Sequence, residues 1–266
     1  MDKNKIYEFA IKIAFESGKV LDKHFGKIDR TDTKSTDIDL VTVADIESEK
    51  HLLDSIKNEY PDHEIVSEES EPLIKQSKYR WVIDPLDGTT NFVHNLPIFA
   101  VSIAFQINHI TEIAVIYNPA AKKLFSSVRG SGSYLNGKKI KCSSSNTLSK
   151  SLIVTGFPYE HDELYDCSFE IFKKFYDKSR GVRRLGSAAL DLCFVAMGRF
   201  DLFYEFRLKE WDVAAGALIA KEAGAIVSDW DGNSYPKNGD RITAISPGIN
   251  KEVLKILKPY HKQFSI

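Results

Sequence analysis

WVIDPLDGTTNF, residues 81–92, joins an apolar strand to two carboxylates and a glycine turn. The strand is predicted over Trp81 to Ile83, and Asp84 and Asp87 follow it with a rigid proline between them. Aspartate is rare in strands and is costly to bury unless it is paired or bound to a metal ion. We therefore expect the chain to turn here and to direct both carboxylates into one pocket.

The oxygen atoms of this stretch suit a hard cation and a phosphate group. The carbonyl of Leu86 lies between the two carboxylates, and Mg²⁺ and Mn²⁺ prefer such oxygen ligands. Gly88 allows close approach to the backbone, and successive amides through Thr89 and Thr90 at the opening of a helical turn favour an anion. The pattern predicts metal-assisted phosphate chemistry. The simpler alternative is an Asp-Gly turn with two capping carboxylates.

The run from Asp84 to Phe92 resembles the signature of the inositol monophosphatase family of Mg²⁺-dependent, Li⁺-sensitive sugar-phosphate phosphatases. A second run, WDVAAG at residues 211–216, resembles the second signature of that family, and two separated signatures are much more specific than one. The resemblance covers essentially the whole chain. It implies an α/β (α+β) fold, the layered αβαβα sandwich of the inositol monophosphatase/fructose-1,6-bisphosphatase superfamily, and a homodimer.

The composition is that of an ordinary globular protein. Of 266 residues, 43% are hydrophobic and 27% are charged, which fits a single phosphatase domain over residues 1–266. A net charge of −1 argues against a general nucleic-acid surface, so no nucleic-acid partner is expected. Three scattered cysteines predict reduced thiols in a cytoplasmic protein, not disulfides or zinc. No signal peptide or bilayer-spanning run is evident, so no membrane association is expected.

Hydrophobic periodicity predicts alternating helices and strands. Helices are expected over residues 5–26, 45–59, 163–178, 188–197, 211–222 and 248–257. Strands are expected at residues 65–66, 81–83, 97–107, 111–117, 123–128, 152–156, 182–186, 200–206, 225–229 and 241–246. Residues 98–141 resemble an antiparallel meander, and strand 97–107 is apolar or small on both faces, which predicts packing on each side.

The polar and serine-rich segments suggest how the chain is divided. Residues 27–41 predict a hairpin or a loop, and residues 255–262 predict a solvated basic tail. The serine-rich stretch 142–151 is the expected boundary between two closely packed subdomains. The first, roughly residues 1–145, would hold the metal and phosphate signature and the antiparallel sheet. The second, residues 146–266, would hold the substrate pocket.

The resemblance gives roles to four further acids. By match to the Glu-Glu pair of the family, Glu68 is expected to bind metal and Glu69 to orient water, although composition alone predicts a solvated acidic loop. Asp45 is expected to hydrogen-bond Thr89 and to help activate water, and its alternative role is an N-cap. Asp212, in the second signature, is expected to bind metal, and its alternative is a favourable charge at a helix start.

The resemblance also implies the surroundings of the substrate. The turn Gly186–Ala188 would line the sugar pocket, and Glu205 would accept a hydrogen bond from a substrate hydroxyl. Arg183 and Arg184 would bind a substrate hydroxyl or phosphate, or form subunit contacts, and Lys34 would lie near a loosely held metal. The expected substrate-binding set is Gly88, Thr89, Thr90, Arg183, Gly186, Ser187, Ala188, Glu205 and Asp212. Glu210 departs from the proline that bacterial members often have, and would add a charge near the substrate mouth.

These residues define a hypothesis for the reaction. Four grouped carboxylates would raise one another's pKa values, so two or three Mg²⁺ ions are expected among them, with Mn²⁺ as a substitute. The expected metal ligands are Glu68, Asp84, Leu86, Asp87 and Asp212. One ion would bind a water that Thr89 and Asp45 orient for direct attack at phosphorus. A second ion, about 4 Å away, would stabilise the leaving alkoxide.

The leading prediction is hydrolysis of inositol 1-phosphate to inositol and phosphate, without a covalent phosphoenzyme. Fructose 1,6-bisphosphate, histidinol phosphate and the 2′-phosphate of NADP remain open as substrates, because shared metal ligands do not identify the alcohol. A regulatory binding protein in a transcription complex is the alternative of a different class. The paired arginines at 183–184 and the basic tail would then form contacts.

Overall fold

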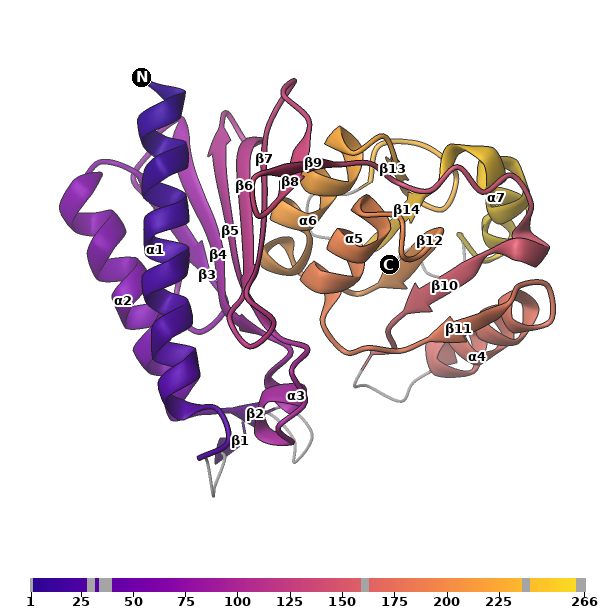
Figure 1. Ribbon diagram of the computed structural model, residues 1–266, viewed down its shortest axis with the longest axis horizontal. Helices are drawn as coiled ribbons and strands as arrows, with labels where there is room; N and C mark the ends of the chain where they lie inside the picture. Colours follow the sequence, from indigo (N-terminus) through magenta and orange to yellow (C-terminus); the bar gives the residue numbers. More distant parts are fainter. Residues whose placement is uncertain (1, 28–31, 34–39, 159–162, 236–239, 262–266) are drawn as a thin grey trace.

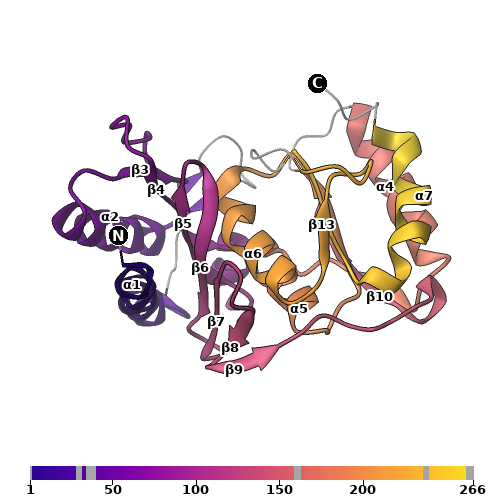
Figure 2. The same cartoon turned by 90° about the horizontal axis from the view of Figure 1, so that it is seen from above.

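The computed structural model describes residues 2–27, 32–33, 40–158, 163–235 and 240–261. Helices and sheets alternate in five layers, which confirms the expected αβαβα sandwich (Figure 1; Figure 2). The first layer consists of α1 (Lys3–His24) and α2 (Val43–Glu59). The middle layer consists of α5 (Ala188–Ala196) and α6 (Glu210–Glu222), and the last of α4 (Glu163–Tyr176) and α7 (Asn250–His261). No helix in the described ranges combines the length and the apolar character needed to cross a bilayer.

The first sheet has seven strands whose spatial order follows the chain. They are β3 (Glu64–Ser67), β4 (Tyr79–Asp87), β5 (Ala100–Ile107), β6 (Ile110–Asn118), β7 (Lys123–Val128), β8 (Ser133–Leu135) and β9 (Lys138–Ile140). Strand β3 is parallel to β4, and every later pair is antiparallel. The antiparallel meander predicted for residues 98–141 is therefore confirmed.

The second sheet has five strands in the order β11, β10, β12, β14, β13. Their bounds are β10 (Leu152–Thr155), β11 (Gly181–Arg183), β12 (Leu202–Phe206), β13 (Ile226–Ser228) and β14 (Arg241–Ile245). Strand β10 is parallel to both of its neighbours, and β14 is antiparallel to both of its own. Short elements complete the chain: β1 (Asp32–Thr33), β2 (Leu40–Val41), α3 (Thr89–Val93), and the 3₁₀ turns η1 (Leu148–Lys150) and η2 (Pro247–Ile249).

Alternation along the strands distributes their side chains between layers. On β5, Phe105 packs toward α1 and α2, whereas Ala104 packs toward α5 and α6, which confirms packing on both faces. On β12, Phe203 faces the middle helices and Tyr204 faces α4 and α7. Because neighbouring side chains of a strand point to opposite faces, each sheet is buried on both sides.

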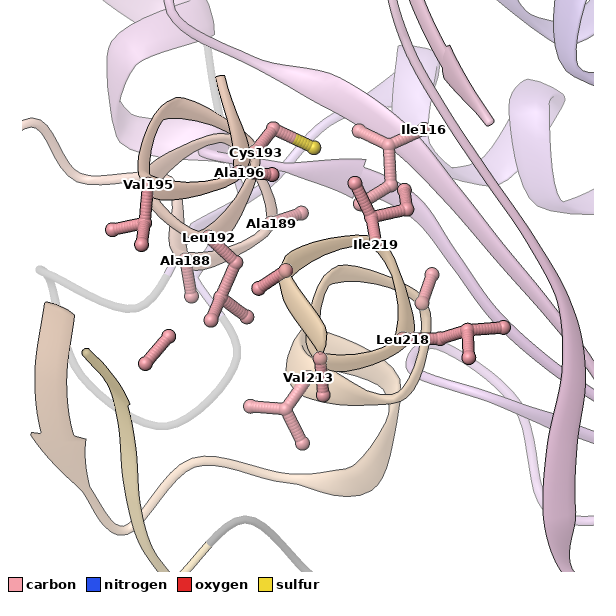
Figure 3. Packing of buried hydrophobic residues seen from close by; sticks show 14 of the residues in the cluster. Ile116, Ala188, Ala189, Leu192, Cys193, Val195, Ala196, Val213, Leu218 and Ile219 are labelled. Carbon is pink, nitrogen blue, oxygen red and sulfur yellow. The ribbon is translucent and has the colours of Figure 1, made fainter. Parts of the chain in front are cut away.

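Small residues allow the middle layer to pack closely between the sheets, as Figure 3 shows. A Cβ on Gly216 of α6 would lie 2.6 Å from Cδ1 of Leu192 on α5. That distance is too short for a real contact, so any larger residue would force the two helices apart. This tight contact fixes the position of α6, whose first turn carries Asp212.

The structure corrects two predictions at the ends of elements. Helix α7 continues to His261, and Leu257 and Tyr260 are buried in the core. The segment 255–262 was predicted to be a solvated tail, but its described part belongs to this packed helix. The strand predicted over residues 182–186 is shorter, Gly181–Arg183, which leaves Gly186 in a turn with a φ of +81°.

Candidate active site

Strand β4 carries the first two carboxylates past Ile83, where the sequence predicted it to end. Asp84 pairs with Ser102 of β5 and Asp87 with Ala100, so the register shifts between them. Such a bulge tolerates the intervening proline, which has no N–H to donate to the ladder. The main-chain N–H two residues after Asp84 donates to its Oδ1 at 2.9 Å, and this bond orients the first carboxylate.

Asp84 is buried among other acids. Burial raises its pKa well above the ordinary value of 3.8, and the charges of Glu68, Asp87 and Asp212 raise it further. Glu68 is also close enough to share a hydrogen bond with it. Two carboxylates can share such a bond only when one of them holds a proton. A cation between them would remove the need for that proton.

Asp87 and Asp212 are held by the two middle helices. Oδ2 of Asp87 accepts hydrogen bonds from the Ser187 hydroxyl at 2.5 Å and from the N–H of Ala189 at 2.9 Å, at the start of α5. Burial outweighs these bonds and raises the pKa of Asp87 to about 6. In the first turn of α6, Asp212 accepts from the N–H of Lys209 at 2.6 Å. Burial, followed by nearby acidic charges, raises the pKa of Asp212 as well.

These four acids come from three segments that are distant in sequence: the end of β3, the bulge of β4 and the start of α6. Their oxygen atoms and their mutual repulsion suit divalent cations. Among the residues that the structure describes, no three acidic, histidine or cysteine side chains converge tightly enough to hold a metal ion as they stand. The geometric basis for the site is therefore electrostatic proximity and not a completed coordination shell.

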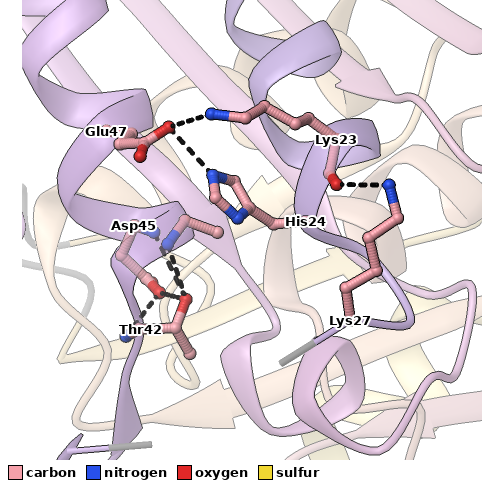
Figure 4. A network of polar contacts seen from close by, with 7 residues as sticks. Lys23, His24, Lys27, Thr42, Asp45 and Glu47 are labelled. Atoms are coloured by element: carbon pink, nitrogen blue, oxygen red, sulfur yellow. Dashed lines mark hydrogen bonds and ion pairs between the residues drawn. The ribbon is translucent and has the colours of Figure 1, made fainter. Parts of the chain in front are cut away.

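Thr89 and Asp45 form the hydrogen-bonded pair that the family resemblance predicted. The Thr89 hydroxyl lies 3.1 Å from Oδ1 of Asp45 and 3.1 Å from the carbonyl oxygen of Leu86. The other oxygen of Asp45 accepts from the hydroxyl and the N–H of Thr42 at 2.6 and 2.8 Å (Figure 4). Thr42, and not Asp45, is the N-cap of α2, but Asp45 completes the capping box at the third helical position, so the alternative of a capping role is confirmed in part. Burial raises the pKa of Asp45 to about 6.

The glycine turn after β4 lies against the turn that precedes α5. Gly88 has a φ of +92°, and a Cβ on it would lie 2.9 Å from the carbonyl of Ile98 and 3.2 Å from that of Gly186. The Asn91 amide bridges the two turns, since it donates to the carbonyls of Ile98 at 2.8 Å and Leu185 at 2.7 Å. The structure thus brings the turn at residues 88–90 and the turn at residues 186–188 together.

Glu205 is buried on β12 beside this second turn. Burial raises its pKa to about 8, although the Arg184 guanidinium acts in the opposite direction. A Cβ on Gly156 would overlap the Glu205 carboxylate, so only glycine leaves room for it. Asp191 of α5 is also buried, and its pKa is raised by burial and by the charges of Glu205 and Asp87.

Sequence reasoning missed Asp191 and gave Arg183 more weight than its neighbour. Within the described residues, Oδ1 of Asp191 has no hydrogen-bond partner. The available signal was an acid in the first turn of an otherwise apolar helix. Arg183 is exposed, and its Nη1 donates to the carbonyl of Val182. The charge that acts on Glu205 and Asp191 is that of Arg184.

For three other predicted residues, the structure gives less information about the expected role. Glu69 follows Glu68 after the end of β3 and is half-buried, and Thr90 is half-buried in α3. Lys34 lies outside the described residues. Their expected roles therefore remain predictions.

Glu210 does not add an unpaired charge near the substrate mouth. Nη1 of Arg80 lies 2.8 Å from each of its oxygens, and the Gln106 amide donates to Oε1 at 2.9 Å. The side chains of the ion pair are only 14% and 17% exposed, Arg80 and Glu210 respectively. The pair therefore attaches the start of α6 to β4.

Known proteins are similar to this chain over nearly its full length. The model of the inositol monophosphatase family matches residues 2–261. A protein of Pasteurella multocida named Nus factor SuhB is 42% identical over 260 residues, which cover 96% of this chain and 97% of that protein.

Solved structures show the same similarity in three dimensions. The extragenic suppressor protein suhB from Bartonella henselae superposes with a TM-score of 0.91 at 34% identity, covering 96% of this chain and 98% of that one. An IMPase from Thermotoga maritima superposes with a TM-score of 0.88 at 32% identity, covering 97% and 98%. The similarity in sequence and the similarity in fold therefore point to the same group of proteins.

Proposed function

Because the chain belongs to the inositol monophosphatase family, we propose that it is a phosphatase that hydrolyses a small phosphate monoester with Mg²⁺ as cofactor. The observation that best supports this is the group of four buried or half-buried acids beside the Thr89–Asp45 pair. Bound Mg²⁺ would supply an acidified water and would neutralise charge on the phosphate. The residues that would hold it are Glu68, Asp84, Asp87, Asp212 and the carbonyl of Leu86.

Thr89 and Asp45 would orient the attacking water. When the Thr89 hydroxyl donates to Asp45, its oxygen remains free to accept a hydrogen bond from water. As the water attacks phosphorus, its proton passes to Thr89 and the threonine proton passes to Asp45. The bond from phosphorus to the ester oxygen breaks at the same time, and the alcohol leaves with a proton taken from solvent. A carboxylate whose pKa is about 6 is suited to accept a proton near neutral pH. No covalent phosphoenzyme is required.

Other residues of the chain would hold the two ends of the substrate. The first amides of a helix have no intrahelical partner, so those of Thr89 and Thr90 are available to phosphate oxygens. On the other side, the turn at residues 186–188 and the Glu205 carboxylate would contact the alcohol. Glu205 would accept a hydrogen bond from a hydroxyl, with Arg184 balancing its charge.

We propose inositol 1-phosphate as the substrate, because the family is named for that activity. Phosphate release should be measured with inositol 1-phosphate, fructose 1,6-bisphosphate, histidinol phosphate and NADP, each with Mg²⁺ and with EDTA. Release that depends on Mg²⁺ and is fastest with the inositol ester would support the proposal. Faster release from another ester would reassign the substrate, and no release from any of them would favour a phosphate monoester outside this panel or a regulatory binding protein.

A second candidate function is a regulatory role in transcription. The observation that favours it is the name Nus factor carried by a relative that is 42% identical, and this name weighs against the expected absence of a nucleic-acid partner. The test is whether an Asp84→Asn variant without phosphatase activity complements loss of the gene. Complementation would separate the cellular role from catalysis, whereas failure together with loss of turnover would favour the enzyme alone.

Three finer properties are part of the same proposal. We propose a homodimer, which sedimentation equilibrium can test, and inhibition by Li⁺, which the same phosphate assay can test. We also propose that the protein is cytoplasmic, as three scattered cysteines predict. A monomer at assay concentrations or full activity in Li⁺ would contradict the corresponding part without affecting the reaction.

A further inference from the structure

A cavity of about 290 Å³ lies along the flank of α6, outside the group of catalytic acids. One side of it is a single face of that helix, with residues recurring at helical spacing. These residues are Glu210, Ala214, Ala217, Leu218 and Lys221. The turn between β5 and β6 and the segment after β13 supply the remaining walls. Of the two sequence signatures, only the second reaches this cavity, through Ala214, and the proposed reaction does not use the cavity.

The polar groups of the inner wall already have partners within the protein. The Glu210 carboxylate is paired with Arg80 and accepts from the Gln106 amide. The Arg129 guanidinium donates to the carbonyl of Thr111 at 2.6 and 2.9 Å. These groups therefore require nothing from a ligand. At this wall, the charged and polar side chains are already paired with other groups of the protein.

The rim is different in character. Lys221 and His109 are exposed at the cavity, and the described residues offer neither side chain a hydrogen bond or an ion pair. The apolar side chains of Ala214, Ala217 and Leu218 also line the cavity. The one acid of the lining is Glu210, whose charge Arg80 already balances. The cavity thus combines an apolar wall with unpaired cationic or donor groups at its edge.

We propose that this cavity binds a small organic anion with an apolar body, for which an aromatic carboxylate is the simplest example. Its volume is at the lower end of the range of about 300–1,000 Å³ that small-molecule sites occupy. The apolar body packs on Ala217 and Leu218, and the anionic group faces Lys221. Tyr235 also lines the cavity, and its hydroxyl, which is protonated at neutral pH, can donate to the ligand.

Occupancy of the cavity is connected to the catalytic acids through the start of α6. Glu210 and Gln106 line the cavity, and Glu210 lies two residues before Asp212 in the same helical turn. A ligand that displaced either side chain would change the position of that turn. In that case, binding of the anion would be linked to binding of a metal at Asp212, and such linkage is reciprocal. The linkage, unlike the binding site, rests on the proposed magnesium role of Asp212.

The first test is calorimetric titration of the full chain with 1-naphthoate, which carries apolar rings and one carboxylate. We expect saturable binding that Lys221→Glu weakens by about five- to tenfold, because charge reversal turns a weak attraction into a repulsion. The matched control Lys251→Glu, an exposed lysine on α7, should bind as the wild type does. Neutral 1-naphthalenemethanol should bind more weakly. Equal affinity in wild type and Lys221→Glu, or no binding at all, would overturn the proposal.

A second variant tests the cavity itself. Ala217→Trp should fill it and abolish naphthoate binding, and circular dichroism shows whether the variant is folded. Binding unchanged in folded Ala217→Trp would place the ligand elsewhere. An acidic peptide with one tryptophan should be titrated as well. If the peptide binds to the wild-type protein and naphthoate does not, the small-ligand proposal is overturned in favour of a protein partner.

The linkage is tested by repeating the titration in saturating Mg²⁺. A changed naphthoate affinity supports it, and an unchanged affinity overturns it. Titration of Mg²⁺ into the protein without naphthoate is run in parallel. If Mg²⁺ binds but leaves the naphthoate affinity unchanged, the linkage alone fails, and if Mg²⁺ does not bind, the proposed cofactor fails.

Discussion

At Thr89 one hydroxyl group has two acceptors. The oxygen atoms of Asp45 and of the Leu86 carbonyl each lie 3.1 Å from it, and it can donate to only one of them at a time. Donation to Asp45 leaves the Leu86 carbonyl available to a cation. A cation on that carbonyl would in turn direct the hydroxyl toward Asp45. The single proton of Thr89 therefore relates the proposed metal site to the proposed base.

Replacement of Thr89 by alanine tests this arrangement. Thr89→Ala should lower kcat by about 10²–10⁴-fold, the usual contribution of a positioned proton-transfer group. Thr89→Ser keeps the hydroxyl and should remain within about tenfold of wild type by the same reasoning. Initial rates of phosphate release give the comparison. Thermal unfolding should show that both variants fold, because Thr89 is half-exposed. A Thr89→Ala enzyme as fast as Thr89→Ser would contradict the role of the hydroxyl.

Gly156 tests the assignment of Glu205. A methyl group at position 156 would overlap the Glu205 carboxylate, so Gly156→Ala should displace it. We expect KM for inositol 1-phosphate to rise by about two- to tenfold, because a hydrogen bond contributes roughly 0.5–1.5 kcal/mol and the raised pKa keeps Glu205 mostly protonated near neutral pH. The effect of Gly156→Ala should disappear in a Glu205→Ala background, where no carboxylate remains to be displaced. Additive effects of the two substitutions would show that Glu205 is not the group through which Gly156 acts.

At the scale of elements, the Arg80–Glu210 pair joins β4 to α6. Removing one partner of a largely buried pair leaves the other charge uncompensated, so Arg80→Met or Glu210→Met should lower the free energy of unfolding by up to about 3 kcal/mol. The double variant should recover much of that loss, since two apolar side chains replace two charges. Urea unfolding of the wild type, the two single variants and the double variant measures the coupling free energy between Arg80 and Glu210. Strictly additive losses would mean that the pair does not hold the helix on the strand.

The sequence was sufficient to predict the type and extent of elements whose apolar residues follow one periodicity. Helix α1 was expected over residues 5–26 and is found at Lys3–His24, because its apolar stripe is continuous. The sequence was misleading where charge concealed a pattern. Lysines around Leu257 and Tyr260 suggested a solvated tail, although these two residues and Val253 lie on one helical face in the core.

Ends of elements were harder to predict because tertiary pairing decides them. Thr42 and Asp45 are both good capping residues, and only the capping box in the structure distinguishes them. Strand β4 continues beyond Ile83 because it bulges opposite β5, with one extra residue between Asp84 and Asp87 that accommodates the proline. Neither outcome can be inferred from the residues of one segment alone.

At the scale of the whole molecule, the candidate site exists only because five layers are stacked. The chemistry of Asp84 and Asp87 could be inferred from their own stretch, whereas Glu68 and Asp212 entered through the resemblance alone. Asp191 was missed, because its neighbours Glu205 and Asp87 are distant in sequence and only the fold brings them near it. The metal and substrate roles of all these residues remain predictions, which binding and kinetic measurements must test.

The buried acids together predict how pH and Mg²⁺ control stability. In the folded protein the pKa values of Asp45 and Asp87 are raised from 3.8 to about 6, and that of Glu205 from 4.5 to about 8. A carboxyl group with a raised pKa binds more protons in the folded than in the unfolded state, so stability falls as pH rises. In EDTA, the melting temperature should therefore decline across the window from about pH 4 to about pH 8. Calorimetric scans in a series of buffers measure that decline.

Added Mg²⁺ should oppose this loss, and increasingly so at higher pH. Below about pH 5 the grouped acids retain protons, which compete with the cation, whereas near pH 8 repulsion is largest and the cation gains most from binding. The melting temperature should thus become nearly independent of pH in saturating Mg²⁺. Asp84→Asn should reduce both the decline in EDTA and the response to Mg²⁺, because one of the repelling charges is gone. A melting temperature that rises with pH in EDTA would mean that the acids are already compensated by groups of the protein, and that they have no need of a cation.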